Sequence, residues 1–96
     1  MMDEAQASLL KRGVRRVLLE WDPLHIGQDA DWPKDEYDIY IEPLAELLLQ
    51  KADVEALTKK LDEIMSQSMG MPAWTRRNRQ FAAKLHELLK ELDVQT

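Results

Sequence analysis

The sequence predicts an all-α fold, a compact bundle of four amphipathic helices with a long ordered loop between the first two. Four segments carry apolar residues at three- and four-residue spacing, which is the period of one helical face. Proline, glycine and short acidic residues lie between these segments, as helix stop and start signals do. No segment alternates polar and apolar residues over a sustained stretch, so we expect no β-sheet.

The first helix is expected over residues 4–21. Pro23 ends it, because the residue before a proline, here Asp22, is disfavoured in the α conformation. The second helix is expected to begin at Asp35, whose carboxylate can accept a backbone N–H bond at the N-cap. Pro43 lies inside this pattern and either kinks the helix near Ile39 or falls in the first turn of a new helix.

The third helix is expected over 54–69, with Asp53 as its N-cap. It ends at Gly70, which can adopt the left-handed conformation while Met71 folds back towards Met65. Few residues separate the second and third helices, so we expect an antiparallel hairpin. The fourth helix is expected over 75–93, with Thr75 as N-cap, and the four apolar stripes then pack against one another.

Length and composition indicate one soluble helical domain over residues 1–96. The chain has 96 residues, of which 45% are apolar and 32% charged, and no cysteine. Such a composition is typical of a globular protein rather than a disordered one. The first residues are acidic and polar, and the longest apolar run is Leu47–Leu49. We therefore expect a cytoplasmic protein that neither enters the secretory route nor contacts a membrane.

The charge distribution carries more information than the net charge of −5. Residues 20–42 hold eight acidic residues and one base, Lys34. Basic residues gather at 11–16 and again at 76–79. Three interpretations follow: the acidic segment is neutralised by these bases within the fold, it forms an acidic face for a basic partner, or it is solvated charge without a role.

The connection between the first two helices is the candidate binding segment. It is longer than most helix-to-helix connections, and such loops are usually functional or disordered. Two tryptophans bracket its polar centre, which argues against disorder, and we expect Trp21, Trp32, Tyr37 and Trp74 to be largely buried. The candidate partner-binding residues are Trp21, Asp22, His25, Asp29, Asp31, Trp32, Asp35 and Asp38.

Neither a metal site nor a cofactor is predicted. His25, Asp29 and Asp31 lie close in sequence, but the glycine and glutamate of a calcium-binding loop are missing, and zinc would need more histidine or cysteine ligands. No nucleophile elbow, phosphate-binding glycine loop or paired histidine motif occurs, so no catalytic residue is predicted. The alternative is a carboxylate-based enzyme or accessory domain that uses Asp22, Asp35 and Asp38.

Nucleic-acid binding has one candidate segment, residues 74–80, with three arginines, an asparagine and a tryptophan. Such residues at a helix N-terminus can contact phosphates. The protein as a whole is acidic, however, and a nucleic-acid-binding domain usually has a broader basic surface. We therefore do not expect a nucleic-acid partner.

Several short motifs resemble those of the YugE-like family of small bacterial proteins of unknown function. They are Trp21-Asp22-Pro23, Ile26-Gly27, Asp35-Glu36-Tyr37-Asp38, Pro43 and Met69-Gly70, and the similarity covers about residues 15–92. The chain departs from the pattern at His25 and at Gln28-Asp29. The resemblance implies a compact helical bacterial protein and no assigned activity. Some relatives look like companions of toxin systems, which leaves open a toxin-binding immunity role.

The sequence thus favours a small non-catalytic protein-interaction module. Its partner, an unidentified protein, would bind through the acidic and aromatic segment Trp21–Asp38, because aromatic anchors surrounded by charge suit such an interface. A desolvated carboxylate in this segment would favour the enzyme alternative instead.

Overall fold

The computed structural model describes residues 4–23 and 37–95, with side chains described to residue 91. Within these residues the protein has four α-helices and no strand, which confirms the all-α prediction. They are α1 (Glu4–Trp21), α2 (Ile41–Leu49), α3 (Val54–Glu63) and α4 (Thr75–Gln95). A 3₁₀ turn, η1 (Asp38–Tyr40), precedes α2, and a π-helical turn, η2 (Ile64–Ser68), continues α3. Most of the predicted loop lies outside the described residues.

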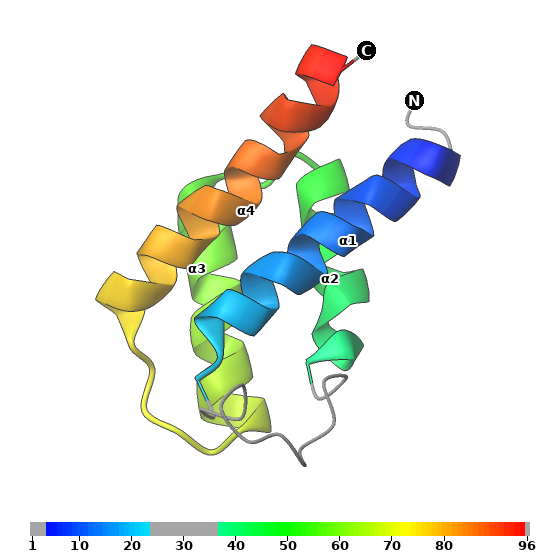
Figure 1. Cartoon of the computed structure of the whole chain (residues 1–96). Coiled ribbons are helices and arrows are strands. Elements are labelled where there is room, and N and C mark those ends of the chain that lie inside the picture. The colour runs from blue at the N-terminus through cyan, green and yellow to red at the C-terminus, as the bar shows by residue number, and fades with distance from the viewer. Residues whose placement is uncertain (1–3, 24–36, 96) are drawn as a thin grey trace.

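The four helices form a compact bundle in which α1 and α4 run side by side in opposite directions (Figure 1). Helices α2 and α3 lie behind them in the same view and run in opposite directions to each other, as the predicted hairpin requires. Helix α4 packs against both α3 and α1, and α2 packs against α1. The described ends of α1 and α4 that lie nearest the chain termini are at the same end of the bundle (Figure 1).

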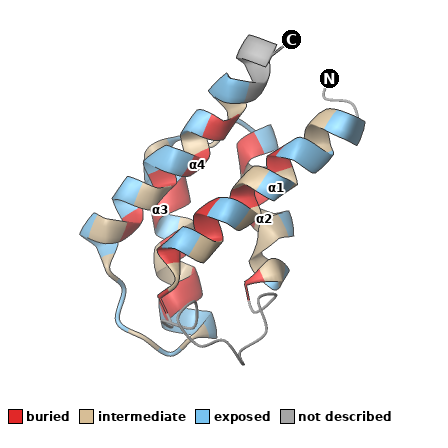
Figure 2. Ribbon diagram, in the orientation of Figure 1, coloured by how far each residue is buried: buried red, intermediate tan, exposed pale blue. Residues whose placement is uncertain are grey.

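Each helix contributes one buried stripe to a single core (Figure 2). Fully burying a leucine or valine side chain stabilises the fold by roughly 1.5–3 kcal/mol before entropy is counted. In α1 the apolar residues at helical spacing, Leu10, Val14, Val17, Leu18 and Trp21, are all buried, whereas Phe81 and Leu89 of α4 are only half-buried. The largest fully buried apolar side chains are Trp21, Tyr37, Leu10, Leu18, Leu44, Leu48, Leu57, Leu61, Met65 and Leu85.

Pro43 lies in the first turn of α2, which confirms the second of the two alternatives for this proline. A single α-helix from Asp35 through Pro43 is wrong, because Tyr37 lies in a turn, η1 occupies Asp38–Tyr40 and α2 begins only at Ile41. In the first turn the missing proline N–H has no intrahelical acceptor to lose. The predicted cap at Asp35 lies outside the described residues.

Helix α2 ends in a Schellman motif without glycine. Lys51 N–H donates to Leu48 O at 2.9 Å, and Ala52 N–H donates to Leu47 O at 3.0 Å. This pattern places Lys51 in the left-handed region, with φ of 62°. Helix α3 then begins as predicted, since Asp53 accepts a hydrogen bond from Ala56 N–H at 2.8 Å.

The end of the third helical segment differs from the prediction in its form. Residues Ile64–Ser68 are π-helical, with Met69 N–H donating to Ile64 O at 3.1 Å, rather than a regular continuation of α3. Gly70 has φ of 65°, and Met71 N–H donates to Met65 O at 2.9 Å, so the predicted glycine stop is confirmed.

The N-cap prediction for Thr75 is wrong. Thr75 is the first residue of α4, and Trp74 O accepts the hydrogen bond from Asn78 N–H at 2.7 Å. The Thr75 hydroxyl donates instead to the Asp62 carboxylate at 2.9 Å. Thr75 therefore ties α4 to α3 rather than capping its own helix.

Candidate functional site

The two ends of the candidate binding segment meet at one place in the fold, between α1 and η1. Trp21 is the last residue of α1 and Tyr37 directly precedes η1, and their ring centroids are 6.2 Å apart with the planes tilted by 52°. Trp21 is 0% exposed and Tyr37 1% exposed, which confirms the predicted burial of both. Trp74 is half-buried, and Trp32 lies outside the described residues.

A hydrogen bond joins the same two ends. The Tyr37 hydroxyl donates to Asp22 Oδ1 at 2.7 Å. Asp22 has φ of 36°, a left-handed conformation that aspartate tolerates better than most residues, and its N–H donates to Leu18 O at 3.0 Å. Asp22 therefore ends α1 and holds Tyr37 with its side chain at the same time.

Behind Trp21, a chain of hydrogen bonds reaches α4 and then α3. Trp21 Nε1–H donates to Asn78 Oδ1 at 2.7 Å, and Asn78 Nδ2–H donates to Asp62 Oδ1 at 2.7 Å. The Asp62 carboxylate also accepts from Thr75. Because Asn78 is 0% exposed, its amide would carry a large desolvation cost without these partners. The chain fixes the end of α1 against both helices.

Arg77 holds the last carbonyl of α1. Its Nη2 donates to Trp21 O, where a cation also interacts favourably with the helix dipole. The guanidinium carbon lies 5.5 Å from the Trp74 ring centroid and 4.7 Å from that of Phe81. The two aromatic rings thus stabilise the guanidinium charge through cation–π interactions. Arg77 Nη1 is buried and has no hydrogen-bond partner in the part of the chain that the structure describes.

Three ion pairs link acids of the 20–42 segment to bases of α1 and α4. Arg15 Nε lies 3.0 Å from Asp38 Oδ1, Lys11 Nζ lies 2.7 Å from Glu42 Oε1, and Lys84 Nζ lies 3.1 Å from Glu20 Oε2. These side chains are substantially exposed, so each pair contributes at most about 1 kcal/mol. Neutralisation within the fold therefore applies to these three acids.

The structure separates the predicted site residues into supporting and exposed ones. Trp21 is fully buried, so in this arrangement it supports the fold and offers no surface to a partner. Asp22 is half-buried and bonded to Tyr37, whereas the Asp38 side chain is 40% exposed beside Arg15. Five further predicted residues lie outside the described residues: His25, Asp29, Asp31, Trp32 and Asp35.

Sequence reasoning missed four residues of this region. Three of them, Asn78, Asp62 and Arg77, belong to the hydrogen bonds that hold the end of α1. The fourth, Ile39, follows Asp38 in the chain and is 72% exposed. One signal was present for Asn78: it precedes the buried Ala82 and Leu85 by four and seven residues, which places it on the inward face of α4.

No family model matches this chain, and neither a curated protein nor a solved structure matches it. The resemblance to the YugE-like family stays a prediction. No three potential metal-ligating side chains, His, Cys, Asp or Glu, cluster among the described residues. No helix in the described part has the length and apolar character needed to cross a membrane.

Proposed function

We propose that this protein is a small non-catalytic interaction module that binds a basic protein partner through the segment Trp21–Asp38. In this proposal Trp21, Asp22 and Tyr37 hold the two ends of the segment. His25, Asp29, Asp31, Trp32, Asp35 and Asp38 contact the partner. The cytoplasm is the proposed compartment, which the absence of cysteine in the sequence supports.

The observation that carries the proposal is the closure of the segment by the Asp22–Tyr37 hydrogen bond. Both residues are anchored in the bundle, Asp22 through α1 and Tyr37 through its buried ring. Fixing the ends of a chain segment during folding reduces the conformational entropy that remains to be lost on binding. Asp22 keeps an unfavourable positive φ to make this bond, and retained backbone strain is a recurring property of functional sites.

Charge supports a basic partner. Within the segment, Asp38 is paired with Arg15 and Asp22 accepts from Tyr37. The sequence between them adds Asp29, Asp31, Asp35 and Glu36 against the single base Lys34. Like charges at this density favour association with a surface of opposite sign, and they make the association rate fall steeply with salt. Ile39, next to Asp38 in the chain, is exposed and offers an apolar contact to the partner.

The enzyme alternative has less support. The two described carboxylates on which it depends, those of Asp22 and Asp38, are bonded to Tyr37 and Arg15. Both bonds join structural elements, and the Asp38 side chain is 40% exposed rather than desolvated. General acid–base catalysis at neutral pH usually needs a carboxylate whose environment differs more strongly from water.

Affinity purification from the native host tests the proposal. The bait is the full chain as wild type, as Asp29→Lys/Asp31→Lys, and as the control Glu55→Lys/Glu87→Lys, which makes the same charge change at two exposed helix positions. We expect one protein with a basic face to be retained by wild type and control, lost with the loop variant, and released by high salt. A toxin would be recognised in this experiment as one such partner.

Retention of the same proteins by all three baits would contradict the proposal. Melting curves with and without divalent cations provide an independent check. A rise of many degrees with a divalent cation would favour a metal-dependent role over the proposed interaction.

A further inference from the structure

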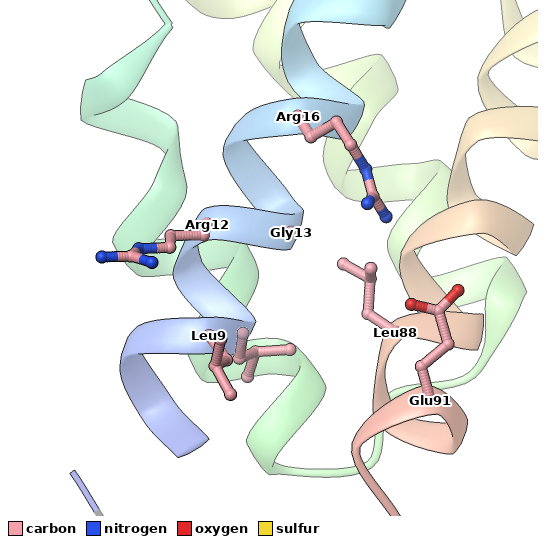
Figure 3. Close-up of a pocket in the computed structure, with 7 residues that line it drawn as sticks. Leu9, Arg12, Gly13, Arg16, Leu88 and Glu91 are labelled. Atoms are coloured by element: carbon pink, nitrogen blue, oxygen red, sulfur yellow. The ribbon is translucent and has the colours of Figure 1, made fainter. Parts of the chain in front are cut away.

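A groove lies between α1 and α4, on a surface that the proposed function does not use (Figure 3). Its volume is about 340 Å³, and its lining includes Leu9, Arg12, Gly13, Arg16, Leu88 and Glu91. A second hollow of about 410 Å³ shares Arg12 and Arg16 and extends along α1 to Leu19 and Glu20. Together the two hollows extend along α1 past Arg12, Arg15 and Arg16.

Gly13 allows the close approach that forms the floor of the groove. A Cβ atom at position 13 would lie 2.8 Å from Leu88 Cδ2, closer than real side chains pack. Because position 13 has no side chain, Leu88 packs against the α1 backbone, and the space above Gly13 stays open. The neighbouring Leu9 is 47% exposed. The floor is therefore apolar at Gly13, Leu9 and Leu88.

Two arginines flank this floor without ion pairs in the described part of the chain. Arg12 and Arg16 are exposed and lie one helical turn apart, and Figure 3 shows Arg16 reaching across the groove towards α4 while Arg12 extends on the other side of Gly13. The preceding residue of each arginine does form an ion pair: Lys11 pairs with Glu42, and Arg15 pairs with Asp38. Helix α1 thus presents two positive charges that have no ion pair within the described residues, on a protein of net charge −5.

We propose that the α1–α4 groove binds an acidic peptide segment of a partner protein. One apolar side chain of the peptide sits over Gly13, beside Leu9 and Leu88. Carboxylates before and after that side chain bind Arg12 and Arg16, whose planar guanidinium groups match a carboxylate with two parallel hydrogen bonds. This surface has the opposite charge to the acidic segment Trp21–Asp38, so the module would hold two different partners.

The carboxylates at both ends of the groove favour a peptide over a polyanion. Glu91 lines one end, where Figure 3 shows its carboxylate near the groove, and Glu20 borders the other end beside Lys84. A nucleic-acid backbone or an anionic membrane would lie against these acids, with Arg12 and Arg16 as the arginines of the two hollows that have no ion pair among the described residues. Polyanion sites usually have a broader basic surface. A peptide can instead place its own positive or neutral residues there.

The test uses a fluorescein-labelled synthetic helical peptide that carries two glutamates four residues apart with a leucine between them. A second peptide has both glutamates replaced by glutamine. Each is titrated with the full chain by fluorescence anisotropy, and amide shifts of the ¹⁵N-labelled protein locate the contact. The protein variants are Arg12→Gln/Arg16→Gln and the control Arg76→Gln/Arg79→Gln, two exposed arginines on α4.

We expect saturable binding of the glutamate peptide with shift changes at Leu9, Gly13 and Leu88. Affinity should fall about tenfold or more with the glutamine peptide or with Arg12→Gln/Arg16→Gln, and should change less than twofold with the control variant. Equal affinity for both peptides, unchanged affinity in Arg12→Gln/Arg16→Gln, or no saturable binding would overturn the proposal. Tighter binding of a single-stranded oligonucleotide or of phosphatidylglycerol vesicles at the same amides would also overturn it, in favour of a polyanion surface.

Discussion

The Tyr37 hydroxyl donates a 2.7 Å hydrogen bond to Asp22 Oδ1, and this bond connects the end of α1 to the start of η1. It joins positions that are 15 residues apart in the chain. Trp21, next to Asp22, packs on the Tyr37 ring and is itself held by Asn78. The two ends of the proposed binding segment are therefore held by core residues, and the strength of these contacts can be measured by ordinary unfolding experiments.

Tyr37→Phe should destabilise the protein by about 1–2 kcal/mol in urea unfolding, because the hydrogen bond from the Tyr37 hydroxyl to Asp22 is lost while the buried ring is kept. Tyr40→Phe is the matched control, since Tyr40 is half-buried and makes no side-chain hydrogen bond among the described residues. That control should change the free energy of unfolding by less than about 0.5 kcal/mol. Equal losses of unfolding free energy in the two variants would mean that the Asp22–Tyr37 bond does not hold the two ends of the segment together.

Asn78→Ala should cost about 2–3 kcal/mol in the same measurement, because it leaves Trp21 Nε1–H buried without an acceptor and opens a small cavity. The fluorescence emission of Trp21 should shift as its environment changes. Gln80→Ala, on the exposed side of α4, is the control and should be nearly neutral. A neutral Asn78→Ala would contradict the hydrogen-bond chain from α1 to α3.

Two substitutions at left-handed positions should have opposite signs. Lys51 has φ of 62° and Gly70 has φ of 65°. Lys51→Gly should stabilise the protein, and Gly70→Ala should destabilise it, each by about 1 kcal/mol, because a Cβ atom disfavours this conformation. No atom lies within 4 Å of the Cβ that Gly70→Ala would add, so its cost is conformational and not steric. Thermal melting measures both changes in stability. Shifts of the melting temperature in the same direction for the two variants would contradict the assigned helix ends.

The packing of α1 on α4 predicts coupling between Gly13 and Leu88. An alanine at position 13 gains helix propensity but crowds Leu88 Cδ2. Gly13→Ala should therefore be more favourable in a Leu88→Val background than in the wild type, by about 1 kcal/mol. A double-mutant cycle in urea gives this coupling directly, and an additive cycle would mean that the helices are not in contact at Gly13.

Local signals predicted the helices well because they act within a few residues. The α1 stripe with Pro23, the Asp53 cap and the Gly70 stop all lie in the structure where the sequence places them. Pro43 could be read in two ways because sequence alone does not show where the preceding turn ends. The π-turn Ile64–Ser68 gave no signal, since one inserted backbone residue leaves the apolar spacing nearly unchanged.

The candidate site was predicted less completely because tertiary contacts build it. Asn78 lies in a run of arginines that reads as a solvated surface, yet the approach of Trp21 buries it. Trp21 was predicted both as a buried residue and as a partner contact, and the structure places it in the core. One interpretation paired the basic residues at 76–79 with the acidic segment, and it gave no sign that Arg77 donates to the last carbonyl of α1. A local sequence pattern does not predict which side chain of another helix contacts the end of a given helix.

Binding through the segment Trp21–Asp38 is tested most directly by calorimetry. The partner recovered by affinity purification is titrated into the wild-type protein and, separately, into Asp29→Lys/Asp31→Lys. We predict an affinity at least about tenfold weaker for the variant, with an unchanged melting temperature, because Asp29 and Asp31 lie outside the helix caps that the sequence predicts. The control Glu55→Lys/Glu87→Lys should bind as the wild type does. Wild-type affinity in Asp29→Lys/Asp31→Lys would contradict binding through the segment Trp21–Asp38.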